Sequence, residues 1–217
     1  MRRKLERFAQ NKLSRNVLED GKEIFETIKG KWHEFFGNDQ PLVVELGCGR
    51  GEYTIGLAQN EPHKNYIGVD IKGDRIWKGS TQAMEFGLDH VAFLRTQIVL
   101  LDKFFEKREI SEIWITFPDP RPKDRDIKRR LTSPRFLKMY RELLKKDGWI
   151  RFKTDNTPLF DYTLELFGTD VQVKDLEYTH DLYNSPLHEE HYGVKTKYEK
   201  IFTEKVEYIK YMKFRFA

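Results

Sequence analysis

Three glycines follow a short apolar run in the stretch "VVELGCGRGEYT". Gly47, Gly49 and Gly51 permit a tight turn and let a ligand approach the backbone closely. A dinucleotide-binding loop has the pattern G-x-G-x-x-G, whose third glycine would fall on Glu52. A carboxylate in the first turn of a helix opposes the binding of a pyrophosphate there. Together with Glu45 just before the loop, Glu52 favours a cofactor that lacks phosphate and has a cationic end.

S-adenosylmethionine meets these requirements, because it has an ammonium and a sulfonium group and no phosphate. Asp70 favours a nucleoside cofactor, since it ends the next apolar run roughly 20 residues beyond the loop, where an acid commonly binds ribose hydroxyls. The alternative is a glycine turn that only packs a helix against a strand.

A second group of residues suited to chemistry follows another apolar run, in "FPDPRPKDRDIKRRL". Pro118, Pro120 and Pro122 stiffen the backbone around Asp119. Basic residues follow at once, as a phosphodiester substrate requires. A carboxylate beside the cofactor, with basic residues around it, indicates methyl transfer to a nucleic-acid base.

The elements that must position these groups alternate along the chain. Apolar runs predict strands at 42–46, 65–70, 91–95, 112–117 and 149–154, and the segments between them predict helices at 52–60, 74–86, 100–107 and 133–146. This alternation predicts an α/β fold with a mostly parallel, doubly wound sheet. The tail at 205–216 alternates apolar and polar residues and predicts an antiparallel strand at or near the sheet edge.

The N-terminal part is harder to place in this pattern. Residues 1–15 are polar and basic and are interpreted as a mobile arm, so that residues 16–217 form a single domain. Apolar residues recur at helical spacing over 17–36, which predicts a helix there.

Composition and charge narrow the class of partner. The net charge is +4 and the basic residues gather in two clusters, one over 2–15 and one over 121–130. Two such clusters favour a nucleic acid as the partner, with solvated faces as the alternative. No apolar run is long enough to cross a bilayer, so no membrane partner is expected. A single cysteine, Cys48, excludes an internal disulfide and indicates a cytoplasmic location.

Taken together, these motifs resemble the bacterial tRNA (guanine-N7)-methyltransferases, which modify the guanine at position 46 in the tRNA variable loop. The resemblance runs from about Trp32 to the C-terminus, and its landmarks are "VVELGCGRGEY", "YIGVDIK", "FPDPRPKDRDIKRRL", "FKTDN", "DLYNS" and "TKYE". It implies a Rossmann-like class I methyltransferase fold, S-adenosylmethionine as cofactor and tRNA as substrate.

Site residues are expected only where the motifs match. Asp119 is implied as the catalytic residue. The expected cofactor-binding residues are Glu45, Gly47, Gly49, Asp70, Gln97 and Asp119. The expected substrate-binding residues are Lys123, Asp155, Thr196, Lys197, Tyr198 and Glu199.

Two positions depart from the family pattern. Where many members have a tryptophan in the proline-rich loop, this chain has Arg121, whose guanidinium can also stack on a base. Where many members have an acid near the adenine, this chain has Gln97, whose amide can still donate and accept hydrogen bonds.

Several alternatives stay open at this level. The acceptor of the methyl group is a tRNA guanine, another RNA base or a protein side chain. A nicotinamide-dependent oxidoreductase is disfavoured by Glu52, and an inactive RNA-binding module predicts binding without turnover. His180, His188 and His191 match no standard zinc spacing, so no metal is expected. Both a monomer and a homodimer are compatible with the sequence.

Overall fold

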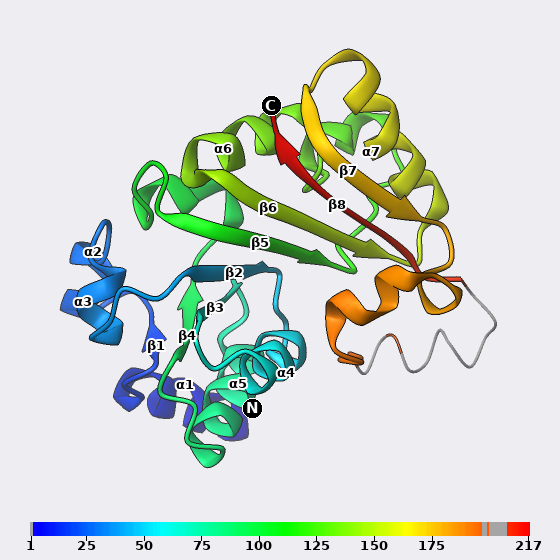
Figure 1. The fold of residues 1–217 in the computed structure, drawn as a ribbon. Helices are drawn as coiled ribbons and strands as arrows, with labels where there is room; N and C mark the ends of the chain where they lie inside the picture. The colour runs from blue at the N-terminus through cyan, green and yellow to red at the C-terminus, as the bar shows by residue number, and fades with distance from the viewer. Residues whose placement is uncertain (1, 197–198, 200–207) are drawn as a thin grey trace.

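One mixed sheet organises the protein. The computed structural model describes residues 2–196, 199 and 208–217. Its sheet has the strand order β1-β4-β3-β2-β5-β6-β8-β7 (Figure 1). The strands are β1 (Val17–Leu18), β2 (Leu42–Leu46), β3 (Asn65–Asp70), β4 (Val91–Arg95), β5 (Ile110–Thr116), β6 (Leu144–Thr154), β7 (Val173–Thr179) and β8 (Lys210–Phe216). β8 pairs antiparallel with both β6 and β7, and the pairings among β1 to β6 are parallel.

Helices cover both faces of this sheet, as a doubly wound α/β fold requires. α4 (Glu52–Asn60) and α5 (Gly73–Glu85) pack on one face, where Tyr53, Ile76 and Phe93 belong to one apolar cluster. α2 (Glu23–Thr27), α3 (Trp32–Phe36), α6 (Pro134–Leu143) and α7 (Thr157–Thr169) contribute to a second cluster. The predicted fold class is therefore confirmed.

The order of the strands defines a topological switch point between β2 and β5. From β2 the chain winds outward through β3 and β4, and it then returns to lay β5 and β6 on the other side of β2. The loops after β2 and β5 therefore leave neighbouring parallel strands in opposite directions. In such sheets, ligands bind outside the carboxyl ends of the strands at this switch point.

The segment 17–36 differs from the single helix that its apolar spacing predicts. It forms β1, α2 and α3, with Gly21 and Gly30 between them at φ values of 85° and 74°. These left-handed conformations cannot belong to a right-handed helix. The predicted helix over 100–107 is likewise replaced by the 3₁₀ helix η1 (Ile98–Lys103).

The N-terminal segment, interpreted from the sequence as a mobile arm, is a helix in this structure. α1 (Arg2–Leu13) packs against α5. The Asn11 side-chain amide donates to the Gly73 carbonyl at 2.8 Å, and the guanidinium of Arg95 lies 4.7 Å from the centre of the Phe8 ring. Basic composition alone does not reveal these contacts, because their partners lie on distant elements.

The C-terminal strand is antiparallel, as its alternation predicts. β8 lies one place in from the sheet edge, because β7 pairs with its other side. The described part of the strand begins at Lys210, and residues 205–207 of the predicted strand lie outside the described residues. No helix within the described ranges has the length and apolar character needed to cross a membrane.

Candidate active site

The carboxyl ends of five adjacent strands bring predicted site residues into one row. Gln97 follows β4, Asp70 ends β3, and the glycine loop (residues 47–51) follows β2. Asp119 and Asp155 come after β5 and β6. Because these strands lie side by side in the order β4-β3-β2-β5-β6, residues far apart in the sequence share one edge of the sheet.

The glycine loop is hydrogen-bonded to the neighbouring strand β3 and has open space next to Gly47. Gly47 and Gly49 have φ values of 74° and 58°, and the Gly47 N–H donates to the Val69 carbonyl at 2.8 Å. A Cβ atom built at Gly47 would meet nothing within 4 Å, so a ligand can reach the backbone there. Gly51 has another role, because a Cβ there would lie 2.6 Å from the Phe93 ring. The third glycine allows close packing beneath the loop.

Asp70 connects the loop to the start of α5. Its carboxylate accepts hydrogen bonds from the backbone N–H groups of Gly49 at 2.9 Å and Lys72 at 2.8 Å. An acid beside an open glycine loop fits the ribose of a nucleoside, and Glu52 in the first turn of α4 disfavours a phosphate there. The residues present therefore fit S-adenosylmethionine. Gln97 is exposed at the start of η1, farther along the same edge.

Glu45 lies beneath the loop rather than at its rim, with only 3% of its surface exposed. Its carboxylate accepts from the Thr54 N–H at 2.8 Å, from the Thr54 hydroxyl, and from the Thr116 hydroxyl at 2.7 Å. Burial raises the pKa of Glu45 to about 7, although these hydrogen bonds act in the opposite direction. Glu45 thus ties the first turn of α4 to β2 and β5, the two strands at the switch point.

Asp119 lies in an exposed loop with unusual backbone conformations on either side. Phe117 and Arg121 have φ values of 47° and 48°, which non-glycine residues rarely adopt. The Asp119 carboxylate accepts from the Arg121 N–H at 3.2 Å and lies 3.1 Å from its guanidinium. Such strain is often found at functional sites. Sequence predicted the prolines as the stiffening element, and the structure adds these two strained residues.

The basic residues after Asp119 divide into two groups. Lys123, Arg125, Lys128 and Arg129 are exposed, on or just before the 3₁₀ helix η2 (Asp124–Arg129). Arg130 instead donates to the Arg121 carbonyl at 3.2 Å and lies 4.4 Å from the centre of the Tyr162 ring. Arg130 therefore braces the loop, and the exposed group is the part that a polyanion can contact.

The C-terminal motif is described only in part. Thr196 and Glu199 bond reciprocally: the Glu199 N–H donates to the Thr196 hydroxyl at 3.0 Å, and the Thr196 N–H donates to the Glu199 carboxylate at 3.3 Å. This is the pattern of a helix capping box. Lys197 and Tyr198 lie outside the described residues. Asp155 is half-buried, and its carbonyl accepts from the Lys210 ammonium at 2.8 Å.

Lys153 is a residue near the site that sequence reasoning missed. It lies in β6 with 0% of its surface exposed, and its ammonium is 2.5 Å from the Glu199 carboxylate. In the sequence it is an ordinary lysine within an apolar strand. Its position two residues before Asp155 in "FKTDN" is the only signal that could have drawn attention to it.

The histidines are bonded separately. His180 lies 3.1 Å from Asp161, and His191 is buried with its Nδ1 3.1 Å from the Val194 carbonyl. Among the described residues, no group of three or more His, Cys, Asp or Glu side chains is arranged to hold a metal ion.

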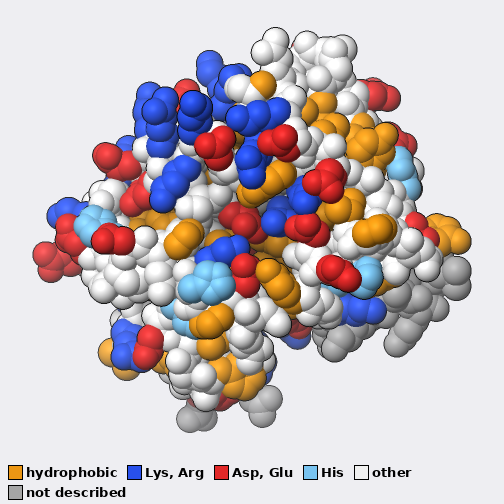
Figure 2. Space-filling model, viewed as in Figure 1, with side chains coloured by type: hydrophobic (Ala, Val, Ile, Leu, Met, Phe, Trp, Pro, Cys, Tyr) orange, Lys and Arg blue, Asp and Glu red, His pale blue; other side chains and the backbone are white. Residues whose placement is uncertain are grey.

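Charged side chains also gather on the sheet face formed by β6 and β8. There Arg151 pairs with Glu112 at 2.8 Å, and Lys213 pairs with Glu190 at 2.7 Å. Figure 2 shows acidic and basic side chains intermixed near the middle of this face. Because the side chains of Arg151 and Lys213 are only 13% and 12% exposed, this face is less suited to a polyanion than the exposed η2 group.

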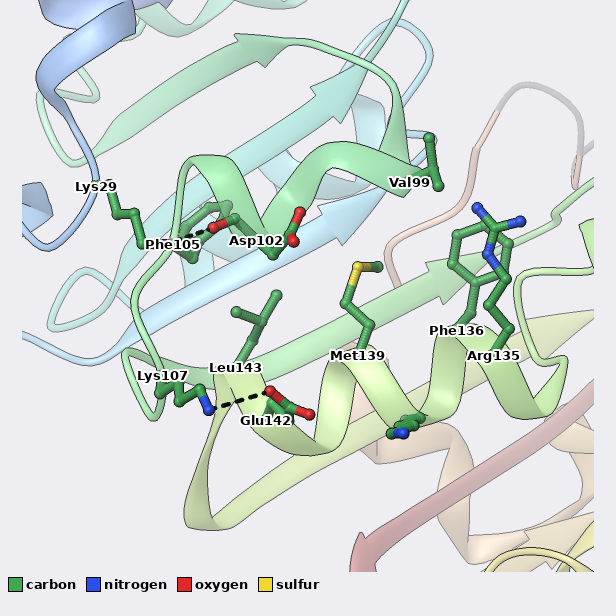
Figure 3. A pocket seen from close by; sticks show the side chains of 11 residues that line it. Lys29, Val99, Asp102, Phe105, Lys107, Arg135, Phe136, Met139, Glu142 and Leu143 are labelled. Atoms are coloured by element: carbon green, nitrogen blue, oxygen red, sulfur yellow. Dashed lines mark hydrogen bonds and ion pairs between the residues drawn. The ribbon is translucent and has the colours of Figure 1, made fainter.

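A groove of about 450 Å³ lies between η1 and α6 (Figure 3). Val99, Phe136 and Met139 line it together with charged side chains at its rim, and Lys107 pairs there with Glu142 at 3.4 Å. None of the predicted site residues lines this groove. It is therefore separate from the row at the carboxyl edge.

Comparison with known proteins agrees with this geometry. A model of the family described as "Putative methyltransferase" matches residues 39–212. The tRNA (guanine-N(7)-)-methyltransferase of Cytophaga hutchinsonii is 51% identical, over 99% of this chain and 98% of that protein. The chain belongs to the tRNA (guanine-N7)-methyltransferase family.

Solved structures place this family member among methyltransferases of the same fold. The 16S rRNA methyltransferase KamB superposes with a TM-score of 0.63 at 14% identity, covering 92% of this chain and 95% of that one. A variant of the 16S rRNA (adenine(1408)-N(1))-methyltransferase of Catenulisporales acidiphilia, solved with its cosubstrate S-adenosylmethionine, has a TM-score of 0.59 at 12% identity, covering 87% and 91%. At these identities the likeness shows the Rossmann-like methyltransferase fold.

Proposed function

We propose that this chain transfers the methyl group of S-adenosylmethionine to N7 of the guanine at position 46 of tRNA. Membership of the tRNA (guanine-N7)-methyltransferase family supports the reaction, and the resemblance of the motifs supports the position. The observation that carries the proposal is the placement of the glycine loop and the Asp119 loop on the neighbouring strands β2 and β5. A cofactor on one loop then faces a base held by the other.

The chemistry requires little proton transfer. When bound, S-adenosylmethionine supplies a methyl group on a positively charged sulfur. N7 of guanine has an available lone pair, so no residue must first remove a proton from it. The glycine loop and Asp70 hold the cofactor, and Asp119 holds the base, so that most of the acceleration comes from alignment.

Asp119 has a second role in this proposal, because methylation leaves the guanine ring positively charged. A fixed carboxylate close to the ring stabilises charge that develops during the transfer. The same carboxylate can orient the base by accepting a hydrogen bond from its edge. Asp155 and the Thr196–Glu199 motif, including Lys197 and Tyr198, are proposed to complete the base-binding side, and Glu45 and Gln97 the cofactor side.

The exposed η2 group, Lys123, Arg125, Lys128 and Arg129, is proposed to contact tRNA phosphates. Contacts of this kind position the RNA without reading its sequence. A tRNA substrate and the single cysteine, Cys48, favour a cytoplasmic protein.

The proposal is tested by incubating the protein with labelled S-adenosylmethionine and unmodified tRNA, and then mapping the labelled nucleoside. We expect 7-methylguanosine at position 46. Label in another base would show that the methyl group goes to a different RNA acceptor. Label in protein would indicate a side-chain substrate. Binding of tRNA without any label would indicate an inactive RNA-binding module.

A further inference from the structure

A buried ion pair joins the C-terminal motif to the sheet beneath the proposed site. Lys153 of β6 and Glu199 both have side chains with 0% exposure, and the ammonium lies 2.5 Å from the carboxylate oxygen Oε1. The hydroxyl of Tyr183 donates to the same oxygen. The other oxygen, Oε2, accepts from the Thr196 N–H at 3.3 Å. Glu199 is thus fixed from three directions.

Lys153 is surrounded by residues from several segments around the proposed site. Its ammonium lies 5.2 Å from the centre of the Tyr53 ring, 5.8 Å from that of Phe117 and 5.7 Å from that of Tyr183. Tyr53 belongs to α4, directly after the glycine loop, and Phe117 begins the loop that carries Asp119. The Phe117 N–H also donates to the Lys153 carbonyl at 2.8 Å. Lys153 therefore contacts the cofactor side, the catalytic loop and the C-terminal motif together.

The burial of the charged Lys153 ammonium is energetically costly and calls for an explanation. Burial lowers the pKa of Lys153 to about 8, even with the Glu199 carboxylate beside it. Well-packed apolar side chains often serve stability as well as a buried ion pair does, whereas such a pair defines one geometry. Around Lys153 that geometry places Glu199, a residue expected at the substrate, against the strand that leads to Asp155.

We propose that Lys153 is a positioning residue for the methyl acceptor: it holds the Glu199 carboxylate and thereby fixes the hydrogen-bonded residues Thr196 and Glu199 against β6 beside the catalytic loop. This inference rests on the proposed function, because it assigns Thr196 and Glu199 to guanine recognition. Lys153 and Glu199 are both enclosed by protein, and the pair acts on the base by fixing Thr196, which is half-buried.

The docking itself is tested without any activity measurement. Lys153→Met keeps the length of the side chain and removes its charge. We expect hydrogen exchange of the backbone N–H groups of Thr196 and Glu199 to become at least about tenfold faster, since both groups lose their anchor on β6. Glu199→Gln should have the same effect from the other partner. Lys213→Met is the matched control, because Lys213 is an ion-paired lysine of the same sheet outside the proposed site. Unchanged exchange in both Lys153→Met and Glu199→Gln would overturn the proposal.

The link to the substrate is tested by a double-mutant cycle on the single-turnover rate at saturating cofactor and tRNA. Lys153→Met should lower this rate at least about tenfold, because small displacements of a substrate-positioning group cost that much or more. In the Glu199→Gln background the same substitution should change the rate less than about twofold, since the two residues act as one unit. Independent, multiplying effects would contradict the proposal, as would an equal loss in Lys213→Met.

Failure of this inference can be told from failure of the proposed function. If the unaltered protein does not methylate tRNA, the proposed function fails, while the exchange measurement still decides whether Lys153 anchors Thr196 and Glu199. If Lys153→Met does not fold, Glu199→Gln alone decides the exchange measurement, because it leaves Lys153 without its counter-charge.

Discussion

The cofactor end and the substrate end of the proposed site differ in how their acidic groups are held. At the cofactor end, Asp70 and Glu45 have 8% and 3% of their surface exposed, and each accepts several hydrogen bonds from the chain. At the substrate end, the side chain of Asp119 is 62% exposed and is held by Arg121 next to it in the same loop. Lys123 and the other exposed η2 residues share this openness.

The two ends of the proposed site are thus suited to two kinds of ligand, a small cofactor and a large polyanion. Buried, bonded carboxylates at the cofactor end fix the backbone that a small ligand will touch. Exposed charges on and after a strained loop are directly accessible to a large polyanion. Substitutions at the cofactor end should therefore change binding and stability together, whereas those at the substrate end should change function and leave stability nearly unaltered.

The largest expected effect is that of Asp119→Asn. The amide keeps the shape and loses the charge, so we expect the single-turnover rate to fall about 100-fold, the usual cost of losing one preorganised electrostatic contact. The free energy of unfolding should stay within about 0.5 kcal/mol, because the side chain is exposed. A rate within a few-fold of the unaltered protein would make Asp119 a turn residue only.

Asp70→Ala probes the opposite end. It removes the acceptor of the Gly49 and Lys72 N–H groups, so we expect the free energy of unfolding to fall by about 1–3 kcal/mol. Affinity for S-adenosylmethionine, measured by calorimetry, should fall about tenfold, as expected when one hydrogen-bonding partner of a ligand is lost. If affinity fell while stability was unchanged, the proposed coupling at this end would be wrong.

Glu45 gives the cofactor end a pH dependence. Its folded pKa of about 7 lies above the ordinary value of 4.5, so between these values the folded protein keeps a proton that the unfolded chain releases. Stability should therefore decrease as the pH rises from about 4.5 to about 7, by on the order of 1 kcal/mol or more, and the contribution of Glu45 should be constant above that window. The free energy of unfolding, measured by urea denaturation, should fall with rising pH across this range more steeply for the unaltered protein than for Glu45→Gln. If the free energy of unfolding depended on pH in the same way for both proteins, the raised pKa of Glu45 would be wrong.

The smallest effect is expected from the exposed basic residues. Replacing Arg125 and Lys128 by Gln should weaken tRNA binding several-fold and lower the slope of log affinity against log salt by about one unit per lost phosphate contact. Cofactor affinity should be unchanged. Lys103 and Lys107, which are exposed elsewhere, provide the control pair. If the slope of log affinity against log salt changed equally for both pairs, the η2 group would be an ordinary solvated surface and not a tRNA contact.

How much the sequence predicted also differs between these regions. The glycine loop and Asp70 could be placed from local pattern, because a strand, a glycine turn and a terminal acid are close together in the chain. The five strands 42–46, 65–70, 91–95, 112–117 and 149–154 all exist in the structure, although β6 begins earlier, at Leu144.

Contacts between distant segments could not be predicted in the same way. The pairing of Lys153 with Glu199 joins positions on separate elements, and nothing in either local sequence specifies it. The docking of α1 on α5 depends on Phe8 and Asn11 meeting partners near Gly73. Such contacts are set by the tertiary fold, and periodicity along one segment carries no record of them.

The central claim, that N7 of guanine 46 accepts the methyl group, is tested most directly with a tRNA whose guanine 46 is replaced by 7-deazaguanine. This base has carbon in place of N7 and keeps the Watson–Crick edge. The account predicts that this RNA binds within about threefold of the unmodified tRNA, since phosphate contacts supply most of the affinity, and that no methyl group is incorporated. Methylation of the 7-deazaguanine RNA at the normal rate would contradict the account.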